Sequence, residues 1–241
     1  LALARQAGAT VHGETGVSRI QRDGDRFDLW TLRGPIKARN IIVATNGYTD
    51  RFDRWLRRRL VPVPTRIIAT EQLPEPLMDE LMPQRRVVDE TRRLYHYYRP
   101  SPDGTRILFG GPCPEPGRNP LAGTNVLQRN LTEIFPQLAD VQVSHSWYGY
   151  VAYNRDYLPR MFLRNGVHYA TGFCGSGVVW ARWLGLKAAL HVLGDASAES
   201  TLHTDRPPKA VPFYRGRPWF LPMVTSWMRF KDELAERRSK R

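Results

Sequence analysis

Short runs of apolar and β-branched residues, separated by turn signals, predict strands in the first part of the chain. Asp23-Gly24-Asp25 stands between the first two runs, and this composition is typical of a tight turn. The opening residues, Leu1 to Ala9, indicate the last turns of a helix that ends at Gly8. The strands predicted after that helix cover residues 9–22, 26–32 and 36–44.

The same short apolar runs continue through the middle of the chain. Pro100-Ser-Pro-Asp-Gly104 is a hairpin signal between two of them. Four ring-bearing residues, Tyr95 to Tyr98, place successive rings on opposite faces of a strand. Such rings either roof a pocket or pack a two-faced sheet. The elements predicted here are strands over 65–71, 94–99, 106–111 and 140–147, and a helix over 125–135.

The run from Val167 to Trp180 has the most informative pattern, because a β-like segment enters a glycine-rich turn that opens an apolar helix. Gly172, Gly175 and Gly177 let the main chain approach a ligand more closely than a Cβ atom would permit. The start of a helix also presents backbone N–H groups and a positive dipole end. The run therefore predicts a site for an electron-rich ligand.

Two familiar motifs do not fit this run. A dinucleotide fingerprint needs a third glycine where Trp180 stands and an acidic residue roughly 20 residues later at the end of a second strand, whereas Gly194 to Ser200 reads as a loop. A nucleophile elbow centred on Cys174 needs a glycine where Ser176 stands. The run is therefore interpreted as a ligand-facing strand, turn and helix.

Three stretches of this region resemble the C-terminal half of the D-amino acid oxidase-like FAD-dependent oxidoreductases, of the glycine, sarcosine and γ-glutamylputrescine oxidase type. They are Gly172 to Val179, Trp147 to Tyr150 and Asp156 to Pro159. The stretch from Ala38 to Thr49 resembles the same family's central strand, which ends in a small-residue turn against the adenosine side of FAD. The resemblance covers roughly residues 1–195.

The resemblance implies an α/β fold with an α+β substrate domain. In this fold an incomplete Rossmann-like FAD-binding domain carries an inserted antiparallel-sheet substrate domain. The family's G-x-G-x-x-G does not occur before Ile41, so we expect a fragment that binds FAD weakly, dissolves poorly and is inactive alone. The implied parts are FAD-binding residues 1–49 and 146–195, substrate-domain residues 50–145 and a tail, 196–241.

The resemblance also implies the residues of the site. Val17 falls where the family's chain touches adenine, although a β-branched residue that fills a strand core explains it equally well. The substrate side is expected to include Tyr98, Tyr150 and Val179. The remaining expected cofactor contacts are Ala44, Thr45, Asn46 and Gly47 on the adenosine side, and Gly172, Phe173, Cys174, Gly175, Ser176, Gly177 and Val178 beside the flavin.

The implied activity is oxidation of a small amine or amino acid, with a hydride equivalent passing to flavin N5 and the imine then hydrolysed. No side chain needs to act as a base, so no catalytic residue is named. Sarcosine oxidase-like members carry a carboxylate-binding lysine where Val179 stands, which favours a longer amine of the γ-glutamylputrescine kind. Tyr148 to Ala152 contains no cysteine that could attach FAD covalently.

Composition adds a competing function class. The net charge is +13, from 36 basic and 23 acidic residues, which favours polyanions. No zinc-finger, RNP or helix-turn-helix pattern accompanies this charge, so we expect solvated basic faces and no nucleic-acid partner. The alternatives to an oxidase are an FAD-dependent protein without turnover, a nucleic-acid-binding module and an inactive fragment. The sequence leaves the amine, the electron acceptor and the oligomeric state open.

The apolar runs and the cysteines of the sequence indicate where the protein is located and whether it binds a membrane or a metal. No apolar run reaches the about 18 residues that span a bilayer, so no membrane span is expected. Cys113 and Cys174 stand far apart, without metal-ligand spacing, which predicts a cytoplasmic protein with no structural metal. Residues 219–230 mix apolar and basic side chains, a composition that suits contact with a membrane surface or a partner, but packing onto the domain's own flank is the favoured interpretation.

Overall fold

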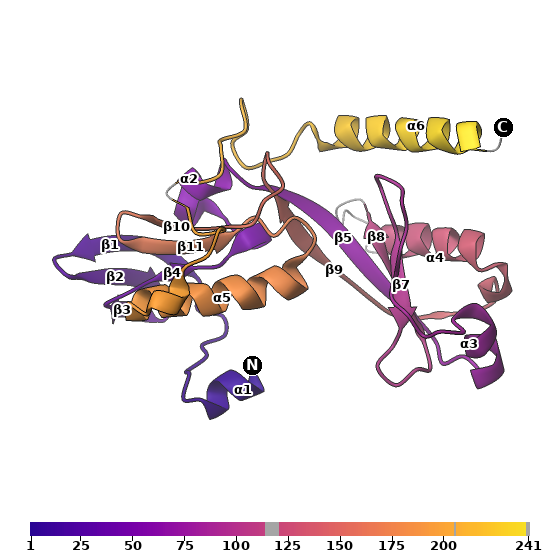
Figure 1. Cartoon of the computed structure of the whole chain (residues 1–241), viewed down its shortest axis with the longest axis horizontal. Helices are drawn as coiled ribbons and strands as arrows, with labels where there is room; N and C mark the ends of the chain where they lie inside the picture. The colour runs from indigo at the N-terminus through magenta and orange to yellow at the C-terminus, as the bar shows by residue number, and fades with distance from the viewer. Residues whose placement is uncertain (114–120, 205, 240–241) are drawn as a thin grey trace. The chain divides into compact units, whose positions relative to one another are not determined.

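The computed structural model describes residues 1–113, 121–204 and 206–239, and these form two compact units (Figure 1). The first unit comprises Leu1–Val61 and Ala152–Gly216. The second unit comprises Pro62–Val151 and Arg217–Arg241. Each unit mixes helices and strands around its own apolar core, in agreement with the expected α/β class.

The first unit begins with a short helix and a three-stranded antiparallel sheet. Helix α1 (Ala2–Gln6) is followed by strands in the order β1-β2-β3. The turn at Asp23-Gly24-Asp25 is confirmed, and Gly24 supplies the positive φ of 59° that it needs. Residues 9–16, in contrast, form no strand. The three strands are β1 (Val17–Asp23), β2 (Arg26–Thr31) and β3 (Gly34–Ala38).

The prediction of a single strand over residues 36–44 is wrong, because the chain changes sheets within it. β3 ends at Ala38 against β2, whereas β4 (Ile42–Val43) pairs in parallel with β11 (Val167–Thr171) in a second sheet. Residues 39–41 make the crossing, and only Ile41 among them is buried. One hydrophobic run can thus contain two strands that belong to different sheets. The periodicity of the sequence alone does not reveal this break.

The second sheet of the first unit has the order β10-β11-β4, with β10 (Arg160–Arg164) antiparallel to β11. All five residues of β11 are buried, as expected for a strand covered on both faces. Helix α5 (Gly177–Leu193) runs along this sheet (Figure 1) and packs Leu184 and Ala188 on it. Gly194 ends the helix in a left-handed conformation, so the predicted helix is confirmed.

Tyr169 and Asp53 join the second sheet to the segment that follows β4. The Tyr169 hydroxyl donates a buried hydrogen bond of 2.8 Å to Asp53 Oδ2. The other carboxylate oxygen accepts the Leu56 N–H and caps α2 (Arg54–Arg57). Burial, reinforced by the Asp53 charge, raises the pKa of Tyr169, so the phenol remains a donor. Short 3-10 turns cover Asn46–Tyr48, Arg51–Asp53 and Ala196–Ala198.

The second unit is built on a five-stranded sheet in the order β6-β7-β8-β5-β9. The hairpin predicted at Pro100 to Gly104 is confirmed: it joins β7 to β8, and Gly104 has a φ of 74°. The helix expected over 125–135 is also present. The elements are β5 (Val61–Thr70), α3 (Glu75–Leu81), β6 (Val88–Asp89), β7 (Tyr97–Pro100), β8 (Ile107–Pro112), α4 (Ala122–Ile134), a 3-10 turn (Pro136–Leu138) and β9 (Val143–Tyr153).

The rings of Tyr95 to Tyr98 alternate between the two faces of this sheet, as predicted. Tyr95 and Tyr97 contact each other at a centroid distance of 6.3 Å. His96 and Tyr98 instead stack on Phe109, at 5.1 and 5.9 Å. The Phe109 side belongs to the apolar core that α4 covers with Leu127 and Leu131.

The chain ends in a helix, α6 (Leu221–Ser239), which belongs to the second unit. The apolar and basic run expected to contact a flank, a partner or a membrane therefore lies mainly on one helix. Throughout the described residues, no helix combines the length and the apolar character needed to cross a bilayer.

Three histidines of the first unit lie close together. The His168 ring is 5.1 Å from that of His191, which lies 4.5 Å from that of His203. Burial, reinforced by the two neighbouring imidazoles, lowers the pKa of His168 below its ordinary value. The folded unit therefore favours the neutral ring.

We expect the free energy of unfolding of this chain to fall as the pH drops from about 7.5 to about 5.5. Above histidine's ordinary pKa neither state binds a proton, whereas below it the unfolded chain is protonated first. Urea denaturation at several pH values measures the slope. His168→Phe should flatten it, and the exposed His12→Gln should leave it unchanged. An equally steep slope in His168→Phe would contradict this assignment.

Candidate functional site

The two stretches that suggested a cofactor site, 38–49 and 167–180, lie side by side in the first unit. β4 and β11 are paired in parallel, with His168 opposite Ile42 and Tyr169 opposite Val43. Parallel strands end at the same edge of a sheet, which is where open α/β sheets bind ligands. The loops that follow these two strands therefore emerge together.

Asn46 connects these two loops. Its side-chain oxygen accepts the Gly172 N–H at 3.0 Å and the Thr171 hydroxyl at 3.4 Å. Asn46 itself has a left-handed φ of 43°, which asparagine tolerates better than most residues. Thr45 and Thr49 close the turn around it through a hydroxyl contact of 2.8 Å. Ala44 to Gly47 is thus a built turn, held against the start of the glycine-rich loop.

The glycine-rich loop bends sharply through three left-handed residues. Gly172, Cys174 and Gly175 have φ values of 76°, 48° and 100°. The Cys174 N–H is held by the Ala152 carbonyl at 3.1 Å, and the Ser176 N–H by the Phe173 carbonyl at 3.0 Å. The Phe173 side chain is buried in the core beneath. These hydrogen bonds and the buried Phe173 side chain therefore hold the loop in its conformation.

This arrangement leaves a set of donors available at the start of α5. Among the described residues, the N–H groups of Gly175, Gly177 and Val178 have no acceptor. Gly175 and Val178 are exposed, Val178 to 94%. Added to the dipole of a 17-residue helix, these donors favour negative charge on a bound group. The sequence analysis expects donors of this kind beside the electron-rich edge of a flavin ring, and that contact stays a prediction.

Cys174 is a neutral thiol in this environment. Its sulfur donates to the Gly172 carbonyl at 3.1 Å and lies 3.5 Å from Asn154 Oδ1. Burial raises the pKa of the thiol, although a backbone hydrogen bond at Asn154 works to lower it. No group of three His, Cys, Asp or Glu residues in the described chain is placed to hold a metal ion.

The other residues predicted to contact the cofactor or the substrate do not lie in the two adjoining loops. Val17 is the first residue of β1, in the other sheet of the first unit, and is half-buried. Val179 is 65% exposed in the first turn of α5. Tyr98 and Tyr150 belong to the second unit, where Tyr98 packs on Phe109 and Phe135 and Tyr150 meets Tyr148 edge-on at 6.1 Å. Their ligand contacts stay predictions.

Sequence reasoning missed Asn154, which supports the loop from below. It is 4% exposed, and its amide donates to the Leu158 carbonyl at 2.6 Å. A Cβ atom on Gly172 would lie 2.5 Å from that amide nitrogen. Asn154 stands just before the stretch Asp156 to Pro159, which resembles the oxidoreductase family. This position in the chain was the signal that could have pointed to Asn154.

We expect Gly172→Ala to lower the free energy of unfolding by about 1–3 kcal/mol, because alanine resists the positive φ and its Cβ would displace Asn154. Gly177→Ala is the matched control. A Cβ there meets nothing nearer than Phe173 at 3.8 Å, and its φ is not positive. Thermal and urea denaturation measure both variants. Equal stabilities would show that the loop does not need this conformation.

Comparisons with curated proteins find relatives that are oxidoreductases. A probable oxidoreductase, OrdL, of Rhizobium meliloti is 32% identical over 95% of this chain and 54% of its own length. The gamma-glutamylputrescine oxidoreductase of Escherichia coli is 30% identical over 80% of this chain and 45% of its own length. The chain thus spans about half the length of the curated relatives it matches.

Solved structures show the same fold. Glycine oxidase from Geobacillus kaustophilus matches 83% of this chain and 52% of its own, with a TM-score of 0.66 and 22% identity. Iminodiacetate oxidase from Chelativorans sp. BNC1 matches 90% and 56%, with a TM-score of 0.65 and 22% identity. The model of the FAD dependent oxidoreductase family, DAO, matches residues 1–189. The chain belongs to this DAO family of FAD-dependent oxidoreductases.

Proposed function

We propose that the protein carrying this chain oxidises an amine or amino acid with FAD as its cofactor. The observation that carries the proposal is the set of N–H donors without an acceptor at Gly175, Gly177 and Val178, at the start of a long helix in a DAO-family chain. We further propose that the first unit holds the cofactor and that the second unit provides the substrate domain.

The proposed cofactor contacts follow the sequence expectations. Val17 and the turn Ala44, Thr45, Asn46 and Gly47 would hold the adenosine side. The loop Gly172, Phe173, Cys174, Gly175, Ser176, Gly177 and Val178 would hold the flavin ring. The contact between Asn46 and the Gly172 N–H supports the grouping, because one side chain aligns both segments.

When bound, FAD would supply the redox chemistry, the two-electron oxidation of the carbon beside the amine nitrogen. This chain would contribute fixed dipoles: the N–H groups of Gly175, Gly177 and Val178 would stabilise negative charge on the reduced flavin ring. They need no reorganisation, because the contacts of Asn46, Ala152 and Phe173 already hold the loop. No proton acceptor among the side chains is required, and we assign none.

For the substrate we propose a longer amine rather than a small α-amino acid. Val179 presents an exposed apolar side chain where sarcosine oxidase-like members have a carboxylate-binding lysine. The relative named gamma-glutamylputrescine oxidoreductase supports this class of amine. Tyr98 and Tyr150 are the proposed substrate contacts of the second unit.

We propose no separate nucleic-acid function for the basic composition, and three arginines have partners within the chain. Arg59 and Arg164 lie over the Trp55 ring, at 3.8 and 4.1 Å from its centroid. Arg66 is buried and donates to the hydroxyls of Thr124 and Ser146. Internal partners of this kind remove cations from the surface that a polyanion would contact.

The decisive test of the flavin site is Gly177→Val in the protein carrying this chain. A Cβ at Gly177 has room in the structure, and circular dichroism checks that the valine variant remains folded. We expect loss of flavin, or anaerobic reduction by amine slowed about a hundredfold, because a β-branched side chain would hold the ring away from these donors and the loss of one such interaction typically has an effect of this size. Flavin absorbance measures the flavin content, and anaerobic stopped-flow kinetics measure the reduction rate.

Trp180→Phe is the control, because Trp180 packs against the core of α5 and the sheet. It should lower stability and keep most of the flavin. Normal flavin content together with normal reduction in Gly177→Val would place the flavin elsewhere and overturn the proposal. Bound flavin that no amine reduces, in the unaltered protein, would instead indicate an FAD protein without oxidase turnover.

Cys174→Ser tests whether the thiol takes part in the reaction. Because the thiol is neutral and held by the Gly172 carbonyl, we expect the variant to keep at least about a tenth of the reduction rate, whereas losing an acid–base group typically costs about 100-fold or more. Anaerobic stopped-flow kinetics make the comparison. A complete loss of reduction with flavin still bound would point to a cysteine-based mechanism.

A further inference from the structure

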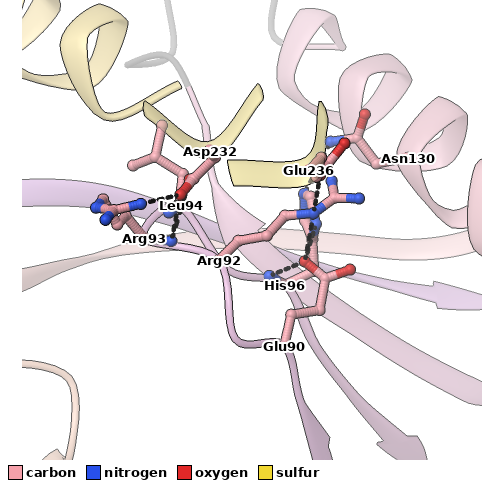
Figure 2. Close-up of polar contacts among 8 residues, drawn as sticks. All are labelled: Glu90, Arg92, Arg93, Leu94, His96, Asn130, Asp232 and Glu236. Carbon is pink, nitrogen blue, oxygen red and sulfur yellow. Dashed lines mark hydrogen bonds and ion pairs between the residues drawn. The ribbon is translucent and has the colours of Figure 1, made fainter. Parts of the chain in front are cut away.

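Helix α6 is fastened to its unit by a carboxylate. Asp232, 9% exposed, accepts the N–H groups of Arg93 and Leu94 at 3.0 and 3.1 Å (Figure 2). The Arg93 guanidinium adds a third donor at 3.0 Å. Burial works to raise the pKa of Asp232, but these hydrogen bonds together bring it below its ordinary value. The carboxylate therefore stays charged and keeps this side of the helix inward.

A second contact one turn later fixes the same orientation. Glu236 accepts from Arg92 Nε at 3.0 Å, and Arg92 also lies 3.9 Å from Glu90 (Figure 2). Glu90 in turn contacts the buried His96 ring at 3.0 Å, and Asn130 of α4 meets its other ring nitrogen at 2.9 Å. The polar side of α6 is thus tied into a network that reaches the core.

The opposite side of α6 is apolar and exposed. Met223, Trp227, Phe230 and Leu234 follow one another at spacings of four, three and four residues, which places them on one stripe about 17 Å long. Their exposed fractions are 65, 57, 54 and 41%. Trp227 and Phe230 stack on each other at 5.8 Å. This outward stripe is the reverse of an ordinary surface helix, which buries its apolar face.

Basic side chains border the stripe on both sides. Lys231 and Arg238 lie along one edge and Arg237 along the other, and all three are exposed. The Lys231 ammonium is 5.0 Å from the Trp227 ring centroid. Of the acidic residues on α6, Asp232 and Glu236 are bound on the inward side, which leaves Glu233 on the outer surface. The border is therefore complementary to anionic groups.

Two other occupants fit the stripe less well. A coiled coil with a second copy needs about three to four heptads of apolar positions, whereas this stripe has two and meets Arg237 at the next position. Nucleic acid is bound by basic and aromatic side chains, but it gains little from the aliphatic Met223 and Leu234. Aromatic and aliphatic residues bordered by Lys and Arg are the composition of helices that lie in a membrane interface.

We propose that α6 is a peripheral membrane-binding helix that inserts the stripe Met223, Trp227, Phe230 and Leu234 into an anionic lipid surface. The aromatic pair takes the level of the lipid headgroups, where tryptophan is favoured. Lys231, Arg237 and Arg238 contact the anionic headgroups. The contacts of Asp232 and Glu236 hold the stripe toward the lipid.

The test is co-sedimentation of the protein carrying this chain with phosphatidylcholine vesicles that contain about 30 mol % phosphatidylglycerol. We expect binding that weakens when the phosphatidylglycerol is omitted or the salt is raised. The double variant Trp227→Ser/Phe230→Ser should bind at least about tenfold more weakly, because two large apolar side chains no longer insert. Lys231→Glu/Arg238→Glu should also lose binding, with the stripe intact.

The matched control is Trp183→Ser in α5. Trp183 is likewise an exposed helical tryptophan, 44% exposed, with a lysine four residues later over its ring, Lys187 at 4.8 Å. It should bind vesicles as the unaltered protein does, and circular dichroism checks that all variants remain folded. Three results overturn the proposal: no vesicle binding, binding that survives Trp227→Ser/Phe230→Ser, or a dimer or DNA complex that this variant abolishes instead.

Discussion

The parallel pairing of β4 with β11 sets the geometry of the candidate site. β4 contributes two residues, so few ladder hydrogen bonds hold it, and a slip of one residue would carry Asn46 away from the Gly172 N–H. The register is secured from outside the site. Val43 and Tyr169 are buried in one core, and Tyr169 stacks on Phe162 at 4.9 Å. The packing of this core therefore determines the positions of the two loops that follow β4 and β11.

Local signals predicted the parts of the site that depend on backbone chemistry. The strand, the glycine turn and the helix from Val167 to Leu193 follow from a β-like segment, glycine spacing and an apolar run, and the structure has them at these residues. The hairpins at Gly24 and Gly104 are of the same kind. Where glycine supplies the positive φ of a turn, residue type carries the information, whereas the positive φ of Cys174 has no such signal.

What the sequence did not reveal depends on contacts between distant residues. Nothing local separates residues 36–38 from 42–43, because the break exists only through different partners, β2 and β11. The role of Asn154 likewise appears only once Gly172 is folded above it. The orientation of α6 is a third case, because its amphipathic pattern indicates two faces but not which one turns inward. The contacts of Asp232 with Arg93 and Leu94 decide that.

If the glycine-rich loop lies beside a flavin as proposed, the neutral state of Cys174 has a chemical consequence. Where oxygen is the electron acceptor, reduced flavin yields hydrogen peroxide within the site itself. Peroxide oxidises thiolates far faster than thiols, and the first product, a sulfenic acid, leads on to irreversible acids. Burial and the hydrogen bond to the Gly172 carbonyl keep the Cys174 proton in place. With the flavin placed as proposed, the loop would carry sulfur beside a source of oxidant and resist damage over many turnovers.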